Sequence, residues 1–286
     1  MPYGFIRYIE NKGYSSETVR SYEKVVNQFF AYLGGIYKKH KEPFQISPSD
    51  IKNYLEEQKE KDKSISTINK ELAILKTMFH YFWEIDKVPV DPAVKIKRLK
   101  VNEKPKVEVT IEQIKQILKK VLSNDAYSKL RKAIFLLATK GLKTSDFRFK
   151  KDDVVDFVEK DIVEIKLKNR SILLKDEEAT YFLEYFYETV FNGSEYVFTT
   201  KPHGEEYGGP IQVMSILNHL RAISQDYLPA ESQPLTLISI RRAIAYDLYL
   251  KKVPIQQIAN DLGIKENSAS NYLKHLTEGT LVQKDT

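Results

Sequence analysis

The residues whose types and spacing favour a chemical role most clearly lie between Val253 and Leu276, in the string VPIQQIANDLGIKENSASNYLKHL. The string predicts two short helices around a tight turn at Gly263, with small Ala259 packing the first helix and Ile258, Leu262 and Tyr272 in the core. This is the pattern of a helix-turn-helix, whose second helix enters the major groove of DNA. The side chains that could face DNA are Lys265, Asn267, Ser268, Ser270, Asn271 and Lys274. A plain helical hairpin gives the same pattern.

Other site chemistries have no residue pattern behind them. The chain contains no GxxxxGK phosphate loop and no GxSxG string, and it has no cysteine. Its five histidines are scattered without the spacing of metal ligands: His40, His80, His203, His219 and His275. The sequence therefore predicts no metal and no cofactor, and nothing in it supports a hydrolase, an NTPase or a metalloprotease.

The net charge of +6 is unevenly distributed. Residues 1–100 carry 18 Lys and Arg against 13 Asp and Glu, and six cations face the single carboxylate of Glu103 between Lys95 and Lys106. This excess favours a polyanionic partner, although a solvated linker looks the same. No apolar run is long enough to span a membrane, and the N-terminus lacks the apolar stretch of a signal peptide. We therefore expect a cytoplasmic, nucleoid-associated protein.

Apolar residues at helical spacing divide the first part of the chain into four helices. The first runs through Phe5 and Ile9 to about Gly13, and the second follows the N-cap candidates Ser15 and Ser16 and closes at Gly34-Gly35. The third begins at Ser47–Asp50 with Ile51, Tyr54 and Leu55 inward. The fourth is capped by Ser64 or Ser66, carries an apolar face through Trp83, and is stopped by Pro89 and Pro92. We expect a helical domain over residues 1–98 and a basic linker over 99–108.

Beyond the linker the helical pattern restarts with Thr110 as a cap. Helices are expected at 111–118, 130–139, from 177, and at 211–223, 238–250, 255–262 and 265–276, with a loop at 201–210. Between 154 and 174 the apolar period changes to that of short strands in a small antiparallel sheet. The predicted fold class is mainly α with this small sheet (α+β), with a second domain over 109–276 and a patternless tail over 277–286.

The order of several strings resembles the tyrosine recombinase and phage integrase family over nearly the whole chain. In the first domain these are FIRYIENKGYSSETVRSYEKVVNQFFAYL, SDIKNYL and SISTINKELAILKTMFHYFWEIDKVPVDPAVKIKRLK; in the second they are RKAIFLLATKGLKTSDF, IKLKNRSILL, LTLISIRRAIAYDLYL and IANDLGIKENSASNYL. The resemblance implies a helical core-binding (SAM-like) clamp followed by a catalytic-like domain. In that family a tyrosine attacks a DNA phosphodiester, two arginines clamp the phosphate, and a hairpin lysine protonates the leaving oxygen.

Carried over residue by residue, the resemblance puts Lys143 in place of the first arginine and keeps the acidic residue after it as Asp146. Lys166, with Lys168 as second choice, matches the hairpin lysine, and Arg241 matches the second arginine. Ile238 and Ile264 replace the His and the His or Trp that assist proton transfer. Tyr272 falls at or beside the nucleophile position, one residue closer to the preceding Leu-Gly pair than is usual in the family.

These replacements predict a member that has lost the reaction. Lysine lacks the planar fork that arginine offers to two phosphate oxygens, and isoleucine cannot move a proton. Removing one preorganised donor costs about 100- to 1,000-fold in rate in other enzymes. DNA affinity should survive, because it depends on many cations spread over a wide surface.

The leading hypothesis is a sequence-specific double-stranded DNA-binding protein without recombinase activity, a regulator or repressor of a phage or mobile element. The expected DNA contacts are Lys143, Lys166, Lys168, Arg241, Arg242, Lys265, Asn271, Tyr272, Arg20, Lys24, Lys70, Lys76, Lys97 and Arg98. A surface salt bridge for Arg241 and Arg242, and a packed core phenol for Tyr272, are the structural alternatives. An active recombinase and a non-catalytic partner of a recombinase stay open as functions, as does a homodimer on DNA.

Overall fold

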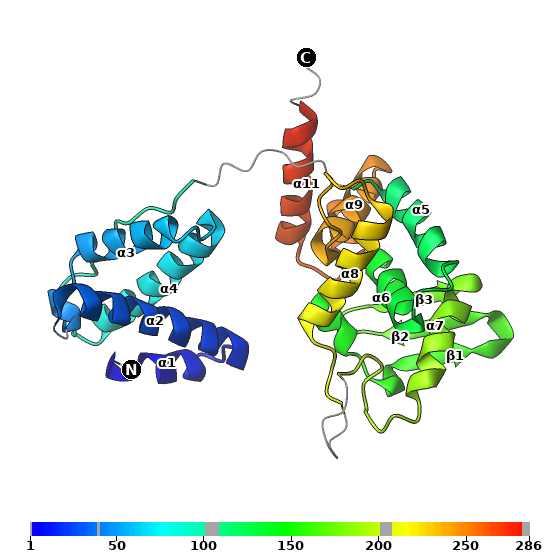
Figure 1. Cartoon of the computed structure of the whole chain (residues 1–286), viewed down its shortest axis with the longest axis horizontal. Coiled ribbons are helices and arrows are strands. Elements are labelled where there is room, and N and C mark those ends of the chain that lie inside the picture. The colour runs from blue at the N-terminus through cyan, green and yellow to red at the C-terminus, as the bar shows by residue number, and fades with distance from the viewer. Residues whose placement is uncertain (1, 39–40, 101–108, 201–207, 282–286) are drawn as a thin grey trace. The chain divides into compact units, whose positions relative to one another are not determined.

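The computed structural model describes residues 2–38, 41–100, 109–200 and 208–281. The chain divides into two compact units, Met1–Glu103 and Lys104–Thr286, each with its own apolar core (Figure 1). Within the described residues, no helix is both long enough and apolar enough to cross a membrane. In the same part of the chain, no group of three or more His, Cys, Asp or Glu side chains is placed to hold a metal ion.

The first unit is a bundle of four helices, α1 (Phe5–Asn11), α2 (Ser16–Tyr37), α3 (Pro48–Glu60) and α4 (Ile65–Glu84). Each predicted start after a serine is confirmed: the hydroxyls of Ser15, Ser47 and Ser64 accept the backbone amide three residues further on. Edge-to-face aromatic pairs link α2 with α3 and α4 in the core, through Phe29 with Tyr54 and Phe29 with Phe79.

Two predictions in this unit are wrong. Helix α2 does not close at Gly34-Gly35 but continues to Tyr37 and ends at Lys38, whose φ is 51°. Glycine disfavours a helix by about 1 kcal/mol, and here the packing of the preceding turns and the contact of Tyr37 with α3 outweigh that cost. Trp83 is not on the buried face of α4: it is 49% exposed and stacks on His80 at 5.7 Å.

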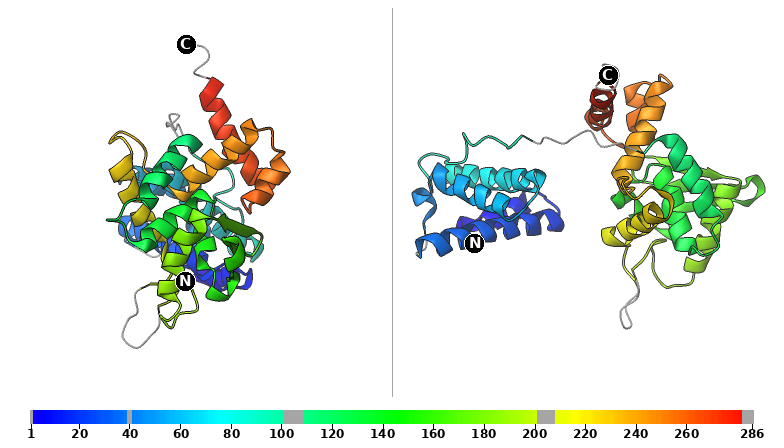
Figure 2. Two further views of the ribbon diagram at one scale, coloured as in Figure 1. Left: turned by 90° about the vertical axis from the view of Figure 1, so that its right-hand side faces the viewer. Right: turned by 45° about the horizontal axis from the view of Figure 1, so that its top comes forward.

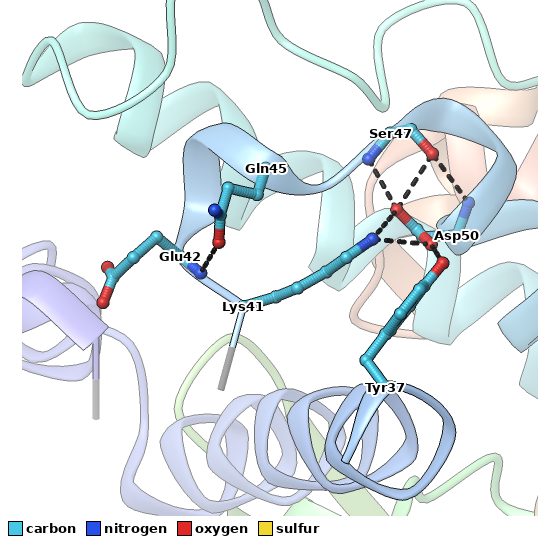
Figure 3. Close-up of polar contacts among 6 residues, drawn as sticks. All are labelled: Tyr37, Lys41, Glu42, Gln45, Ser47 and Asp50. Atoms are coloured by element: carbon cyan, nitrogen blue, oxygen red, sulfur yellow. Dashed lines mark hydrogen bonds and ion pairs between the residues drawn. The ribbon is translucent and has the colours of Figure 1, made fainter. Parts of the chain in front are cut away.

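The carboxylate of Asp50 closes the first turn of α3 and connects it to α2 (Figure 3). It accepts hydrogen bonds from the Ser47 backbone amide at 2.7 Å, the Ser47 hydroxyl at 2.9 Å and the Tyr37 hydroxyl at 2.5 Å. Lys41 pairs with it at 3.0 Å. Burial alone would raise the pKa of Asp50, but the hydrogen bonds from Tyr37, Ser47 and Lys41 outweigh burial and lower that pKa to about 2.

We expect Asp50→Asn to lower the free energy of unfolding of the first unit by about 2 kcal/mol at pH 7, since each pKa unit is worth about 1.4 kcal/mol. The pKa of Asp50 falls from 3.8 to about 2 on folding, so its contribution is complete above about pH 4 and is lost as the pH drops from 4 to 2. Trp83 is the only tryptophan of the chain, so urea unfolding followed by its fluorescence reports on this unit. If the wild type and Asp50→Asn lost equal stability between pH 5 and pH 2, the Asp50 carboxylate would not be the group that stabilises the first unit.

The second unit combines helices with one three-stranded sheet. Its helices are α5 (Ile111–Leu122), α6 (Lys129–Thr139), α7 (Glu177–Thr189), α8 (Val213–Tyr227), α9 (Leu237–Leu250), α10 (Ile255–Asp261) and α11 (Glu266–Leu281). Its strands are β1 (Val154–Phe157), β2 (Ile162–Lys166) and β3 (Ser171–Lys175), antiparallel in the order β1-β2-β3. The predicted fold class is therefore confirmed. Helix α9 contacts α5, α6, α10 and α11 (Figure 2), so it joins the main core to the last two helices.

The sheet buries one face against the helices. Val163 and Ile165 of β2 and Leu174 of β3 are fully buried, whereas the residues between them point to the open side, as the period of two requires. A four-residue turn joins β2 to β3, and the Leu167 amide donates to the Arg170 carbonyl at 2.8 Å across it. Lys166 precedes this turn and Lys168 lies in it, and the side chain of Arg170 reaches the ends of α6 and α10.

The predicted patternless tail is wrong at its start, because α11 continues to Leu281. The predicted basic linker falls mainly on residues 101–108 and the predicted loop on 201–207, both outside the described residues. At the end of that loop Thr200 donates its backbone amide to the Gly209 carbonyl at 2.9 Å.

Candidate functional site

Helices α6 and α10 end in the same way, with a glycine at positive φ: 78° at Gly141 and 60° at Gly263. After each helix two amides turn back to earlier carbonyls: Gly141 to Ala138 at 2.9 Å, Leu142 to Leu137 at 3.4 Å, Gly263 to Asn260 at 3.0 Å and Ile264 to Ala259 at 2.9 Å. This is the Schellman motif, in which an apolar residue follows the glycine. It leaves the last carbonyls of each helix to find partners elsewhere.

Two arginines supply those partners. Arg170 donates from Nη2 to the carbonyls of Gly141 at 2.9 Å and Lys140 at 3.3 Å, and from Nη1 to the carbonyl of Asp261. Arg241, which is only 4% exposed, donates from Nη2 to the carbonyl of Leu262 at 2.8 Å. The C-terminus of α10 is thus capped by two guanidinium groups, as the negative end of a helix dipole favours.

A cavity of about 430 Å³ opens beside these helix ends. Its walls come from the Lys143 turn, the β2–β3 turn and Gly263, and they carry five cationic side chains against two carboxylates: Lys143, Arg148, Lys166, Lys168 and Arg170 against Asp146 and Asp153. Burial lowers the pKa of Arg170; the Asp146 carboxylate opposes that effect and the charge of Arg241 adds to it. The excess of positive charge makes this hollow a place for an anion.

The structure brings three of the predicted site lysines together in this basic cavity. Lys143 lies 3.7 Å from Asp146 through its Nζ, and its backbone amide donates to the same carboxylate at 3.2 Å. Lys166 ends β2 and Lys168 lies in the turn, and both side chains are exposed. All three can therefore extend toward a bound anion from two different walls.

The other predicted members of the site do not line this cavity. Arg241 is buried, with its guanidinium 5.9 Å from the centre of the Tyr272 ring. Tyr272 is half-buried against Ile258, Leu262 and their neighbours, as the packed-phenol alternative predicts. Arg242 is also half-buried on α9. The surface salt bridge considered for Arg241 is ruled out by its burial and its carbonyl partner.

The two isoleucines occupy different surroundings. Ile238 lies in the first turn of α9 and is 54% exposed, so it presents hydrocarbon to solvent. Ile264 is the apolar residue of the second Schellman motif and packs against the small core of α9, α10 and α11. Neither side chain offers an atom that can donate or accept a proton.

The two last helices form the predicted pair around Gly263. Ile258, Ala259 and Leu262 are buried, and the predicted readers Lys265, Asn267, Ser270, Asn271 and Lys274 are exposed on the turn and on one side of α11. Ser268 is half-buried. Most of the predicted readers are therefore accessible to a partner in the described part of α11.

In the first unit a groove of about 650 Å³ runs between α2 and α4. Three of the predicted contacts line it: Arg20 and Lys24 from α2 and Lys70 from α4. Thr18, Ser21 and Tyr22 add hydroxyl groups to the same wall. Cations and hydroxyls along one groove are the groups that proteins use to hold DNA phosphates.

The remaining first-unit predictions do not belong to this α2–α4 groove. Lys76 is half-buried and donates to the Val94 carbonyl at 3.2 Å, so it connects α4 to the segment that follows it. Lys97 and Arg98 are exposed beyond the bundle.

Sequence reasoning missed Arg170 and Arg148. The signal for Arg170 was its place in the string IKLKNRSILL, four residues after Lys166. The turn of a hairpin brings its two ends to one edge of the sheet, so an arginine there lies close to the lysine. Arg148 follows the Lys143 turn and had no pattern that distinguished it.

Comparison with known proteins connects this geometry to a family. Residues 3–84 match the family model described as the phage integrase N-terminal SAM-like domain. A protein of Caldanaerobacter subterraneus subsp. tengcongensis that carries the name of a tyrosine recombinase is 32% identical over 145 residues, 50% of this chain and 49% of its own length. The tyrosine recombinase XerC of Thermodesulfovibrio yellowstonii is 26% identical over 145 residues, 50% of this chain and 46% of its own. The chain is thus similar to tyrosine recombinases and, in its first unit, to phage integrases. It spans about half the length of the curated relatives it matches.

Solved structures agree on the fold. The Tn1549 transposon integrase in complex with a circular intermediate DNA superposes with a TM-score of 0.70 at 18% identity, over 93% of this chain and 92% of that one. A lambda integrase dimer bound to a core site gives a TM-score of 0.67 at 16% identity, over 94% and 92% of the two chains. The chain thus has an integrase-like fold with a SAM-like N-terminal domain.

Proposed function

We propose that this recombinase relative is a sequence-specific binder of double-stranded DNA that does not exchange strands, and that it regulates genes of a phage or other mobile element. One observation carries the proposal. Lys143, Lys166 and Lys168 line a single cationic cavity, whereas hydrocarbon stands at the two positions that the resemblance assigns to proton transfer, 238 and 264. The charge of the cavity suits the binding of a phosphate, whereas isoleucine side chains at 238 and 264 cannot supply the proton transfer that cleavage of a phosphodiester needs.

The case for DNA binding is electrostatic. Affinity for a duplex comes mostly from cations that neutralise phosphates and release counterions, so it tolerates the loss of catalytic groups. The basic cavity, the α2–α4 groove and the exposed side of α11 supply cations and hydrogen-bond donors on both units. The solved relatives that share the fold are integrases bound to DNA.

Strand exchange needs hydrogen-bond and proton donors that are aimed at the reacting phosphate. Lys143 is held by Asp146 at 3.7 Å and can place one ammonium, not a planar fork, on a phosphate. One Nη of Arg241 already donates a hydrogen bond to the Leu262 carbonyl. Ile238 and Ile264 cannot transfer protons. The site that the resemblance predicts therefore keeps cations that can hold a phosphate but lacks the full set of acids and bases that its cleavage needs.

Titration of the full chain against genomic fragments is expected to reveal nanomolar binding to a few sites, weakening by about three or more powers of ten between 50 and 200 mM salt. Selection of bound duplexes from a random pool should then return a recurring motif, and its half-site spacing reports whether two copies bind. Binding that is absent or independent of salt would refute the proposal. Selected sequences without any motif would refute the specificity.

An active recombinase is the second candidate, and Tyr272 favours it. Its ring lies 5.9 Å from the guanidinium of Arg241, so a phenol and an arginine that the family pairs around a phosphate are neighbours here. The curated relatives also carry recombinase names. The two candidates differ in one product, a covalent bond between Tyr272 and DNA.

Assembly and location complete the proposal. A lambda integrase with this fold is a dimer on its core site, so we infer that this chain also binds DNA as a homodimer, in the cytoplasm where that DNA lies. Pairing with an active recombinase is the third reading, and it predicts co-purification with that enzyme and no DNA affinity of its own.

A further inference from the structure

We propose that Arg170 is a positioning residue: it locks the β2–β3 turn to the C-termini of α6 and α10, and this lock fixes the cationic cavity. Its three carbonyl partners lie at the C-terminal ends of two helices that are far apart in the sequence: Lys140 and Gly141 directly after α6, and Asp261 as the last residue of α10. The value of the lock for anion binding rests on the proposed DNA-binding function. The lock itself does not.

The geometry leaves little freedom for the Arg170 side chain. A Cβ added at Gly263 would lie 3.4 Å from both Cδ and Nε of Arg170, so the stem of the arginine fills the space beside the glycine. A Cβ at Gly141 would lie 2.8 Å from the Leu262 side chain and 3.7 Å from Nη2 of Arg170. Both glycines are therefore favoured by their positive φ, and Gly141 also by the close approach of Leu262, which brings the end of α10 beside the end of α6.

Only an arginine can make this connection. Its planar fork presents donors in two directions, and here Nη1 serves α10 while Nη2 serves α6. A lysine at this place would bring one ammonium to one helix end and leave the carbonyls of the other without a partner. The guanidinium also carries positive charge to the negative ends of two helix dipoles at once.

The lock has a direct consequence for the cavity. Lys143 follows Gly141 by two residues, Lys166 precedes the turn that ends with Arg170, Lys168 lies within that turn, and Gly263 forms the third wall. All three walls therefore meet at the carbonyls that Arg170 binds. Fixing them together holds the lysines of two walls around one volume before any anion arrives, which lowers the entropy lost on binding.

Hydrogen exchange of the full chain without DNA tests the lock. In Arg170→Ala the amides of 140–143, 166–170 and 261–264 should exchange faster together, by about tenfold or more, while the first unit stays unchanged. Arg170→Lys keeps the charge and most of the stem, and should show nearly the same local loss with its thermal midpoint closer to that of the wild type. The matched control is Arg221→Ala, which removes an exposed guanidinium whose partner, Asn218, lies within the same helix. It should leave the three segments protected.

Three outcomes overturn the proposal. Protection retained in Arg170→Lys would show that charge alone suffices. A uniform rise in exchange across the second unit would show that Arg170 adds only general stability. Loss confined to 166–170 would show that the turn is not tied to the helix ends.

A double-mutant cycle on DNA affinity adds a readout that general stability does not move. If Arg170 positions the turn, Lys166→Ala should cost several-fold less affinity in the Arg170→Ala background than in the wild type. Additive losses would overturn the positioning role. If the wild-type chain binds no DNA, the proposed function fails, and hydrogen exchange still decides the lock.

Discussion

A nicked duplex that traps the covalent intermediate of strand exchange is expected to leave this chain free of attached DNA. The reaction needs the Tyr272 oxygen to attack a phosphate while acids and arginines stabilise the charge that develops. Tyr272 is half-buried in the small core of α9 to α11, Ile238 and Ile264 supply no proton, and Lys143 replaces a fork with a point charge. Each missing donor costs about 100- to 1,000-fold, so adduct formation should fall below detection.

The measurement is a denaturing gel of the chain with labelled nicked substrate that carries the selected binding motif. Tyr272→Phe is the matched control, since it removes one oxygen and keeps the packed ring. Wild type and control should give the same pattern, with free DNA alone. A slow band in the wild type that disappears in Tyr272→Phe would make the chain an active recombinase and refute the proposed loss of chemistry.

Removing the three lysines of the cavity together is expected to produce the second large effect. Each neutralised phosphate contributes about 0.9 to the slope of log affinity against log salt, so Lys143→Ala with Lys166→Ala and Lys168→Ala should lower that slope by about 0.9 for the one phosphate in the cavity, and by up to about 2.7 where each lysine meets its own phosphate. Near 0.1 M salt these changes correspond to losses of affinity from about tenfold to several hundred-fold. The loss should be similar for all sequences, because phosphate contacts carry no base preference.

The control for this triple variant is an equal change of charge elsewhere on the same unit. Lys115, Lys120 and Lys160 are exposed and do not line the cavity, so replacing all three with alanine removes the same charge from other surfaces. Their loss should change the salt slope much less. Equal slopes for the two triple variants would show that the cavity is not where a phosphate binds, and an altered base preference would show that one of its lysines reads a base.

Most of the architecture could be predicted from the sequence, because its local signals, the helix caps and the period of apolar residues, agree with the fold. Serine caps placed the starts of α2, α3 and α4, and Thr110 placed the start of α5. The change of apolar period between 154 and 174 gave the sheet. Where packing opposes a local preference the prediction failed, as at Gly34-Gly35, because a sequence pattern does not include the energy of tertiary contacts.

The candidate site was predictable in part. The resemblance brought Lys143, Lys166 and Lys168 to one place, and the structure puts all three on one cavity. It did not predict that Arg241 is buried against the Leu262 carbonyl, or that Arg170 joins two helix ends. Both roles depend on backbone carbonyls, and every residue has one, so no sequence pattern identifies which carbonyl will lack a partner.

Arg241 has a structural role in addition to any role at a phosphate, because it is buried and caps the end of α10. A chain that stops cutting DNA would no longer need it on a phosphate, yet replacing it would leave the end of α10 with an unsatisfied carbonyl and a cavity in the packing. An arginine at position 241 is therefore weak evidence that a chain with this fold breaks DNA, because the fold itself uses the residue. Position 238 faces solvent and has no such structural duty, so its residue type reports more directly on the chemistry.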